Sequence, residues 1–173
     1  MDLTPLQAYE RYASLGPDFL TWLLIRVVDT NVPAPASEPD LVIDIQGPLV
    51  FTGEGGEARM VSMAGDEAAT APEVFSALRQ GKRLTRAKVL FTVHEEVYKF
   101  TLDAEHFDLK GVKLPVPTMP DGPEFVELRA QSLMRLYQLL DDLYEAFLEI
   151  RLSPDLWKGE LEQARRTGRK TEG

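Results

Sequence analysis

The chain has 173 residues, no cysteine and a formal net charge of -9 at pH 7. The lack of cysteine excludes disulfides and thiolate metal sites, and the acidic balance excludes a protein that coats nucleic acid with its whole surface. A chain of this length predicts a single domain. The most apolar run, residues 19–28, is too short to span a bilayer and contains Arg26, and no signal peptide is visible, so we expect a soluble cytoplasmic protein without a membrane partner.

The first thirty residues predict a helical entry. Residues 4–7 have the spacing of a capping box, and residues 6–13 have helical periodicity. Gly16 and Pro17 are expected to end this helix and to start a second one over residues 18–28. Because the second helix is apolar nearly all round, it is either buried on several sides or lies in an interface, and we favour burial.

A small antiparallel meander is expected next. Three prolines between residues 31 and 39 predict an extended linker. Residues 41–45 and 49–52 are predicted to be two strands separated by a turn at Gly47-Pro48, and residues 59–63 to be a returning strand after the glycine-rich turn 53–56.

The central block, residues 72–114, begins with a helix of about two turns. Thr70 is the expected N-cap, with Glu73 completing a capping box and Pro72 in the first turn. Gly81 is expected to end the helix in the left-handed conformation.

The rest of this block predicts strands at residues 85–93, 97–102 and 107–114. Alternation places the apolar residues on one face of each strand. Gly111 is predicted to form a bulge, because the inward positions shift by one residue after it. The outward face then collects basic side chains, namely Arg86, Lys88, Lys99, Lys110 and Lys113, with Arg79, Lys82 and Arg83 at its entry.

Clustered cations in an acidic chain suggest binding of a polyanion, because phosphate contacts need positive side chains arrayed along a surface. The eight residues that we predict to bind DNA are Arg79, Lys82, Arg83, Arg86, Lys88, Lys99, Lys110 and Lys113. The alternative is a solvated sheet face on which lysine prevents edge pairing.

The last third predicts helices. A proline-rich linker precedes one long helix over residues 124–151, whose apolar residues from Val126 to Phe147 recur with four–three spacing. Its partner is the helix 18–28, the sheet, or the same helix of a second subunit. A final helix is expected from Ser153 to about Arg166, followed by a basic tail that either solubilises the chain or contacts a polyanion.

No pattern in the sequence is typical of catalysis, so we expect a protein that is not an enzyme and needs no cofactor. The glycines of residues 53–56 are not followed by a helix pattern, which argues against a dinucleotide fingerprint. His94 and His106 lie in predicted turns without the spacing of a zinc helix. Asp103 and His106 are interpreted as surface side chains rather than as metal ligands.

The segments ALRQGKRLTRAKVLF (77–91), VYKFTLD (97–103) and LKGVKLP (109–115) resemble the C-terminal half of the recombination-associated RdgC family. FLTWLLIR (19–26) and FLEIRLSPDLW (147–157) are similar to divergent members. The resemblance implies a homodimer that binds duplex DNA with little sequence preference and restrains RecA filaments. It also implies that Lys82, Arg83, Arg86 and Lys88 face DNA, supported by Lys99, Lys110 and Lys113.

We therefore expect a single α+β domain with an antiparallel sheet of five to six strands: a helical entry (1–30), a meander, short helix and basic sheet (41–114), and C-terminal helices (124–167). The predicted function is sequence-independent binding of duplex DNA that modulates homologous recombination. We expect the protein to act at the nucleoid as a dimer, with a recombinase or another protein as its partner. The alternative is a protein-interaction or oligomerisation module that does not bind DNA.

Overall fold

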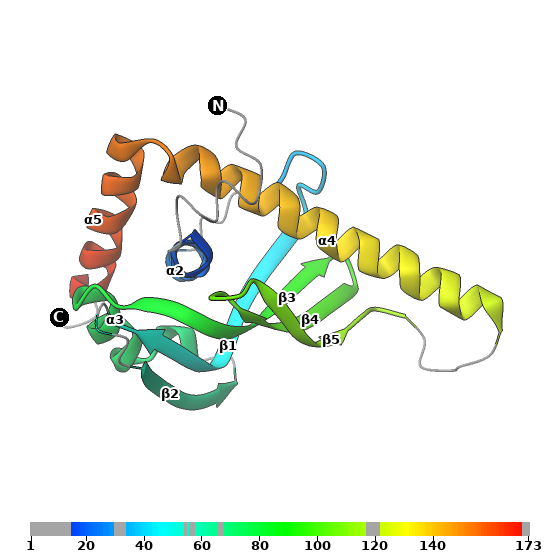
Figure 1. The fold of residues 1–173 in the computed structure, drawn as a ribbon, viewed down its shortest axis with the longest axis horizontal. Coiled ribbons are helices and arrows are strands. Elements are labelled where there is room, and N and C mark those ends of the chain that lie inside the picture. Colours follow the sequence, from blue (N-terminus) through cyan, green and yellow to red (C-terminus); the bar gives the residue numbers. More distant parts are fainter. Residues whose placement is uncertain are drawn as a thin grey trace.

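The computed structural model describes residues 15–29, 34–53, 55, 58–65, 68–116 and 122–170, with the backbone alone for residues 58–65 and 167–170. It has an α+β fold with an antiparallel sheet and a long C-terminal helix, which confirms the predicted fold class (Figure 1). The predicted helix at residues 6–13 lies outside the described residues. The described elements, in chain order, are α2 (Leu15–Val28), β1 (Leu41–Thr52), β2 (Ala58–Gly65), η1 (Ala68–Thr70), α3 (Pro72–Arg79), β3 (Arg83–Val93), β4 (Glu96–Asp103), β5 (Asp108–Lys113), α4 (Pro123–Arg151) and α5 (Pro154–Lys170).

The five strands form one sheet in the order β2-β1-β3-β4-β5, and all neighbouring strands are antiparallel. The prediction of a turn at Gly47-Pro48 is wrong, because β1 runs continuously from Leu41 to Thr52. The register between β1 and β3 shifts between Gln46 and Val50, so an irregularity within the strand accommodates the proline. Two segments that the sequence separates are therefore one strand, and the sheet has fewer strands than the separate segments suggest.

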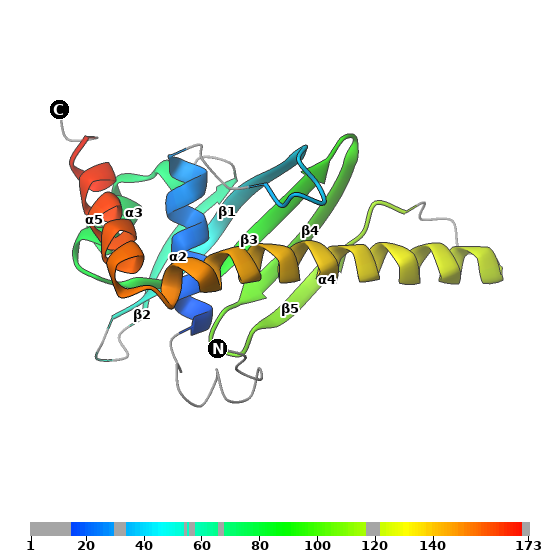
Figure 2. The same cartoon turned by 90° about the horizontal axis from the view of Figure 1, so that it is seen from above.

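One face of the sheet is covered by helices and forms the core (Figures 1 and 2). Helix α2 packs on it and buries Phe19, Trp22 and Leu24 completely, as expected for a helix that is apolar nearly all round. Phe147 of α4 meets the ring of Phe19 at 5.5 Å and that of Trp22 at 5.7 Å between centroids. The inward residues of β3 and β4 complete the core, in the parity that their alternation predicts.

The start of α3 differs from the prediction in its cap. Its N-cap is Ala71, whose side chain makes no capping hydrogen bond, while Thr70 belongs to the preceding 3-10 turn η1. Pro72 occupies the first turn as predicted, where a missing N–H costs nothing. Gly81 has a φ of 75° and follows the helix in the left-handed conformation, which is also as predicted.

Helix α4 has 29 residues, of which only the C-terminal part packs on the sheet. Its fully buried residues begin at Leu136, and Leu133 packs against the core one turn earlier. The first turns of the helix extend beyond the sheet (yellow in Figures 1 and 2). At its other end, Arg151 Nε donates to Oδ2 of Asp18 on α2 at 2.8 Å. Helix α5 continues to Lys170, four residues beyond the predicted end.

The described helices include none that combines the length and the apolar character needed to cross a lipid bilayer.

Candidate nucleic-acid interface

The outer face of the sheet is the one opposite α2 and α4, and no described helix covers it (Figures 1 and 2). Its side chains alternate along β3, β4 and β5 with the buried side chains of the core. Every described outward side chain of these three strands is half-buried or exposed, except that of Asp103. This open face carries five of the eight cations that the sequence predicts to bind DNA.

Strand register places four lysines of the outer face side by side. Lys88 on β3 pairs with Thr101 on β4, and Thr101 pairs with Lys110 on β5. In the neighbouring row, Lys99 on β4 pairs directly with Lys113 on β5. Because residues opposite each other have Cβ atoms about 5 Å apart, the lysines form one continuous basic patch.

The pairing of Lys99 with Lys113 is unfavourable in the isolated protein, since like charges directly opposite each other destabilise a sheet. Neither of these lysines, nor Lys88, makes an ion pair with any of the described residues. An anion bound over the patch would relieve this repulsion. Lysine on the edge strand β5 also discourages pairing with another sheet, so the arrangement fits both interpretations of the sequence.

Asp103 neutralises two cations of the outer face, one of which, Lys110, belongs to the lysine patch. Its Oδ2 lies 3.5 Å from Nη2 of Arg86, its cross-strand partner, and 3.6 Å from Nζ of Lys110. On the other carboxylate oxygen, Oδ1, it faces Nδ1 of His106 at 3.5 Å and accepts a hydrogen bond from the backbone N–H of Glu105 at 3.2 Å. Arg86 and Lys110 therefore share their charge with an acid of the same face.

The environment of Asp103 keeps its carboxylate ionised. Burial favours the neutral acid, but the hydrogen bonds and charges of Arg86 and His106 outweigh it, together with the backbone N–H of Glu105. The pKa of Asp103 is consequently lower than its usual value of 3.8. Asp103 carries its full negative charge at neutral pH and above.

The remaining three predicted residues lie at the corner between α3 and β3. Arg83 does not join the outer face, because its Nε is 3.1 Å from Oδ1 of the buried Asp18 on α2. Arg79 is the last residue of α3, and Lys82 follows Gly81 in the turn. The structure thus brings together Arg86, Lys88, Lys99, Lys110 and Lys113, and leaves the other three at one edge of the patch.

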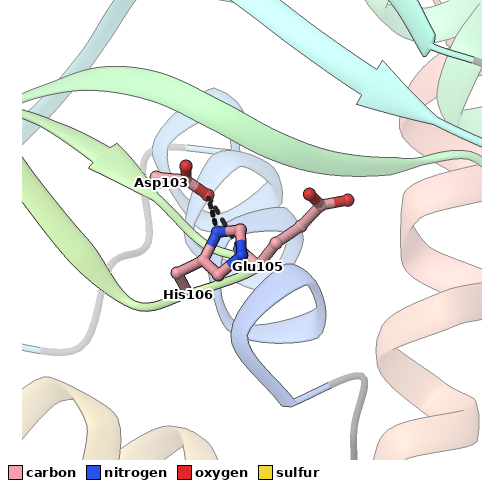
Figure 3. Close-up of side chains that lie close together, drawn as sticks. All are labelled: Asp103, Glu105 and His106. Atoms are coloured by element: carbon pink, nitrogen blue, oxygen red, sulfur yellow. Dashed lines mark hydrogen bonds and ion pairs between the residues drawn. The ribbon is translucent and has the colours of Figure 1, made fainter.

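Asp103, Glu105 and His106 also come close enough to be considered as metal ligands (Figure 3). Figure 3 shows Asp103 and His106 pointing toward one another, with Glu105 between them in sequence. Hard divalent cations need free carboxylate oxygens, whereas Oδ2 of Asp103 already faces the cations Arg86 and Lys110. A metal ion would meet their repulsion, so we assign no metal site here.

A hollow of about 360 Å³ lies where α4 meets α5, lined by the side chains of Arg151, Leu152, Pro154, Trp157, Lys158 and Leu161. Its lining is mostly apolar, and the guanidinium of Arg151 stacks on Trp157 at 5.2 Å. The same guanidinium bonds Asp18. The polar group of this hollow is therefore already used to hold α2, α4 and α5 together.

Two acids that pair with residues predicted to bind DNA were not anticipated from the sequence. Asp103 follows Val97, Lys99 and Thr101 on the outward parity of β4, and this alternation is a signal that would have placed it among the cations. The sequence has no comparable pattern that marks Asp18, because its partner Arg151 is 133 residues away. Periodicity places a residue on a face of its own element but does not identify a contact between distant elements.

Comparison of the chain with protein-family models, with curated proteins and with solved structures gave no match.

Proposed function

We propose that this protein binds the phosphate backbone of duplex DNA through the outer face of β3, β4 and β5. The observation that supports this proposal most directly is the patch of Lys88, Lys99 and Lys113, which have no ion-pair partner among the described residues. The patch lies on an open sheet face of a chain whose net charge is -9. Fixed positive charge kept in one place on an acidic protein is typical of a localised anion site.

The three lysines would make contacts of one kind. Lysine is a flexible point charge, so it neutralises phosphates without the bidentate geometry with which arginine reads bases. Phosphate contacts position a protein on DNA and carry no direct sequence information. The proposed binding is therefore independent of sequence, with Arg86 and Lys110 contributing less because Asp103 shares their charge.

A salt titration tests the proposal. Binding to a fluorescent random-sequence duplex is measured by anisotropy, starting at about 50 mM salt. With three to four phosphates neutralised, log Kobs is expected to fall against log salt with a slope of about -3 to -4. Lys88→Glu/Lys99→Glu is expected to abolish binding or to reduce the slope by about two, since both changed side chains belong to the patch.

The matched control is Lys158→Glu/Arg166→Glu, which makes the same change in charge on exposed residues of α5. This variant is expected to bind DNA nearly as the unchanged protein does. Reversal of Arg86 is avoided, because it would place a glutamate beside the buried Asp103. No binding at low salt would overturn the proposal, and loss of binding in the control alone would move the site to α5.

The resemblance to the RdgC family implies a role in homologous recombination, which we propose as the context of the DNA binding. It would be tested by adding the protein to a strand-exchange reaction, with Lys88→Glu/Lys99→Glu as the inactive comparison. Inhibition by the unchanged protein and not by the variant is the expected result. Equal inhibition by both would separate any effect on recombination from the lysine patch.

A second candidate function is a protein-interaction module that does not bind DNA. The observation that favours it is the start of α4, where the apolar side chains of Val126, Leu128 and Met134 are exposed. Under this alternative the lysines only keep the outer face solvated, and Lys88→Glu/Lys99→Glu changes nothing beyond net charge.

A further inference from the structure

The hollow where the end of α4 meets the start of α5, here called the α5 hollow, has apolar walls that solvent reaches (Figures 1 and 2). Its volume of about 360 Å³ falls at the lower end of the range of about 300–1,000 Å³ that is typical of ligand sites. Leu152 and Leu161, which line it, are each 41% exposed. Because apolar surface gains free energy when it leaves water, these walls favour contact with an apolar group.

One face of α5 runs along the length of the α5 hollow. Pro154, Trp157, Lys158 and Leu161 follow the i, i+3, i+4, i+7 spacing that places residues on one side of a helix. From Pro154 to Leu161 the helix rises by about 10 Å, which is the length of about three residues of extended chain. The α5 hollow therefore has the length of a short peptide segment.

Trp157 forms a fixed wall of the α5 hollow. Its ring packs edge-to-face on Phe147 of the core, at 5.9 Å between centroids, and the guanidinium of Arg151 lies 5.2 Å from its centre. Arg151 is itself held by the buried Asp18, to which its Nε donates at 2.8 Å. Since these contacts already fix the wall, a ligand would not have to order it on binding.

Two sources of positive charge border the α5 hollow. Asp18 pairs with both Arg83 and Arg151, so one carboxylate balances two guanidiniums and the cluster keeps a net positive charge. Lys158 is exposed and makes no ion pair with the residues that the structure describes. An anionic group that entered the α5 hollow would therefore be attracted to Lys158 and to the guanidinium beside it.

Two neighbouring acids limit how much negative charge the α5 hollow accepts. Asp155 and Glu162 lie one helical turn before and one after Lys158 on α5. A ligand with several acids would meet their repulsion, whereas a single carboxylate can approach Lys158 between them. The favoured ligand thus joins one carboxylate to an apolar group. The C-terminal residue of a peptide does so, because its carboxylate and its side chain are attached to the same Cα.

We propose that the α5 hollow binds the C-terminus of a partner polypeptide whose last residue is leucine or phenylalanine. The terminal carboxylate pairs with Lys158, and the last side chain packs on Trp157 and Leu161. This mode combines capture of a terminal carboxylate with an apolar anchor. The inference does not depend on DNA binding, because the α5 hollow belongs to α4 and α5 and the lysine patch to the sheet.

Two synthetic peptides test the proposal, Gly-Ser-Gly-Ser-Gly-Leu and Gly-Ser-Gly-Ser-Gly-Phe, each labelled with fluorescein at the N-terminus. Each is made with a free C-terminal carboxylate and with a C-terminal amide, and anisotropy is followed as the full chain is added. The acid forms are expected to bind about tenfold or more tightly than the amides, because only they offer a charged partner to Lys158. No binding of either acid form, or equal binding of acid and amide, would overturn the proposal.

A pair of variants locates the binding on α5. Leu161→Glu is expected to weaken binding of the acid peptides by about tenfold or more, because it replaces an apolar wall by a like charge. The matched control is Leu156→Glu, which makes the same change at an exposed leucine (56%) that is not in the lining and is expected to bind as the unchanged chain does. Circular dichroism checks that both variants keep their helices. Equal losses in the two variants would contradict a site in the α5 hollow.

Lys158→Gln tests which group receives the carboxylate. The change is expected to lower the ratio between the affinities of the acid and amide peptides toward one, while the amide peptides bind as before. A merely structural role of Lys158 would weaken both forms of the peptide equally and would leave the ratio unchanged. An unchanged ratio would therefore overturn the assignment of Lys158 and the proposed binding mode.

Discussion

At the scale of single residues, Asp103 sets how much positive charge the outer face presents. It lies on the same face as the lysines and is close to Arg86, His106 and Lys110. Its carboxylate is nearly buried, with the residue only 7% exposed, so these contacts are less screened than ordinary surface ion pairs. Asp103 therefore holds two of the predicted DNA contacts in place while it weakens their attraction for phosphate.

Asp103→Asn is expected to strengthen DNA binding. The change removes one negative charge and frees Arg86 and Lys110 for phosphate, so the salt slope should become steeper by about one to two. The matched control is Asp108→Asn, which removes an exposed acid of the same face that pairs with Asp103 in the strand register. Anisotropy titrations of the two variants would contradict the role assigned to Asp103 if they gave equal increases.

Because its pKa is lowered in the folded chain, Asp103 also makes the stability of the fold depend on pH. A carboxyl group whose pKa is lower in the folded chain than in the unfolded chain stabilises the fold above its usual pKa, and this contribution is lost as the pH falls through the folded value. Asp103→Asn is therefore expected to lower the free energy of unfolding by about 1–3 kcal/mol at neutral pH, with a smaller difference below the usual value of 3.8. Urea unfolding at pH 7 and at pH 3 measures both. A difference that does not shrink in acid would contradict an ionised Asp103 as its source.

At the scale of elements, the position of α2 depends on a close backbone contact at its start. A Cβ atom placed on Gly16 would lie 1.8 Å from the carbonyl oxygen of Ala104, in the turn between β4 and β5. The same turn places Phe107 against the ring of Phe19, at 5.8 Å between centroids. Gly16 was predicted to separate two helices, whereas in the structure it is the second residue of α2 and allows the helix to approach the turn that follows Asp103.

Gly16→Ala is expected to destabilise the fold by about 1–3 kcal/mol, because the neighbouring backbone has to move. The control is Gly159→Ala in α5, where an added Cβ meets nothing within 4 Å. That change should stabilise by about 0.5–1 kcal/mol, since alanine loses less backbone entropy than glycine in a helix. If the close contact at Ala104 is the cause, chemical unfolding shows changes in the free energy of unfolding that have opposite signs in the two variants. A loss of stability in both variants would point to a general sensitivity to alanine instead.

At the scale of the whole molecule, the features that were predicted correctly are those marked by a short repeat of apolar residues in the sequence. The alternation from Ala87 to Val93 and from Tyr98 to Leu102 placed the right residues in the core, because side-chain direction in a strand depends only on local geometry. The bulge at Gly111 was visible as a shift of that alternation. The basic character of the outer face follows from the same local pattern.

The features that were missed depend on contacts between distant parts of the chain. The continuity of β1 through Gly47-Pro48 arises because strands on both sides pair with it. The ion pairs of Asp18 with Arg83 and Arg151 join three elements. The apolar repeat of α4 looked uniform, whereas the sheet ends beside the helix and covers only part of it. Sequence periodicity carries no information about where a partner surface stops.

The conformation of one residue, Gly111, decides which side chains of β5 reach the outer face. Lys110 and Lys113 are three residues apart, so in a regular strand they would point to opposite faces, and only the extra residue at Gly111 (φ 60°) turns both outward. Loss of the left-handed conformation at Gly111, with every residue kept, would remove no charge and no apolar side chain. It would nevertheless turn Lys113 toward the core and Val112 toward solvent, so the frame of β5, more than its composition, decides which surface it presents.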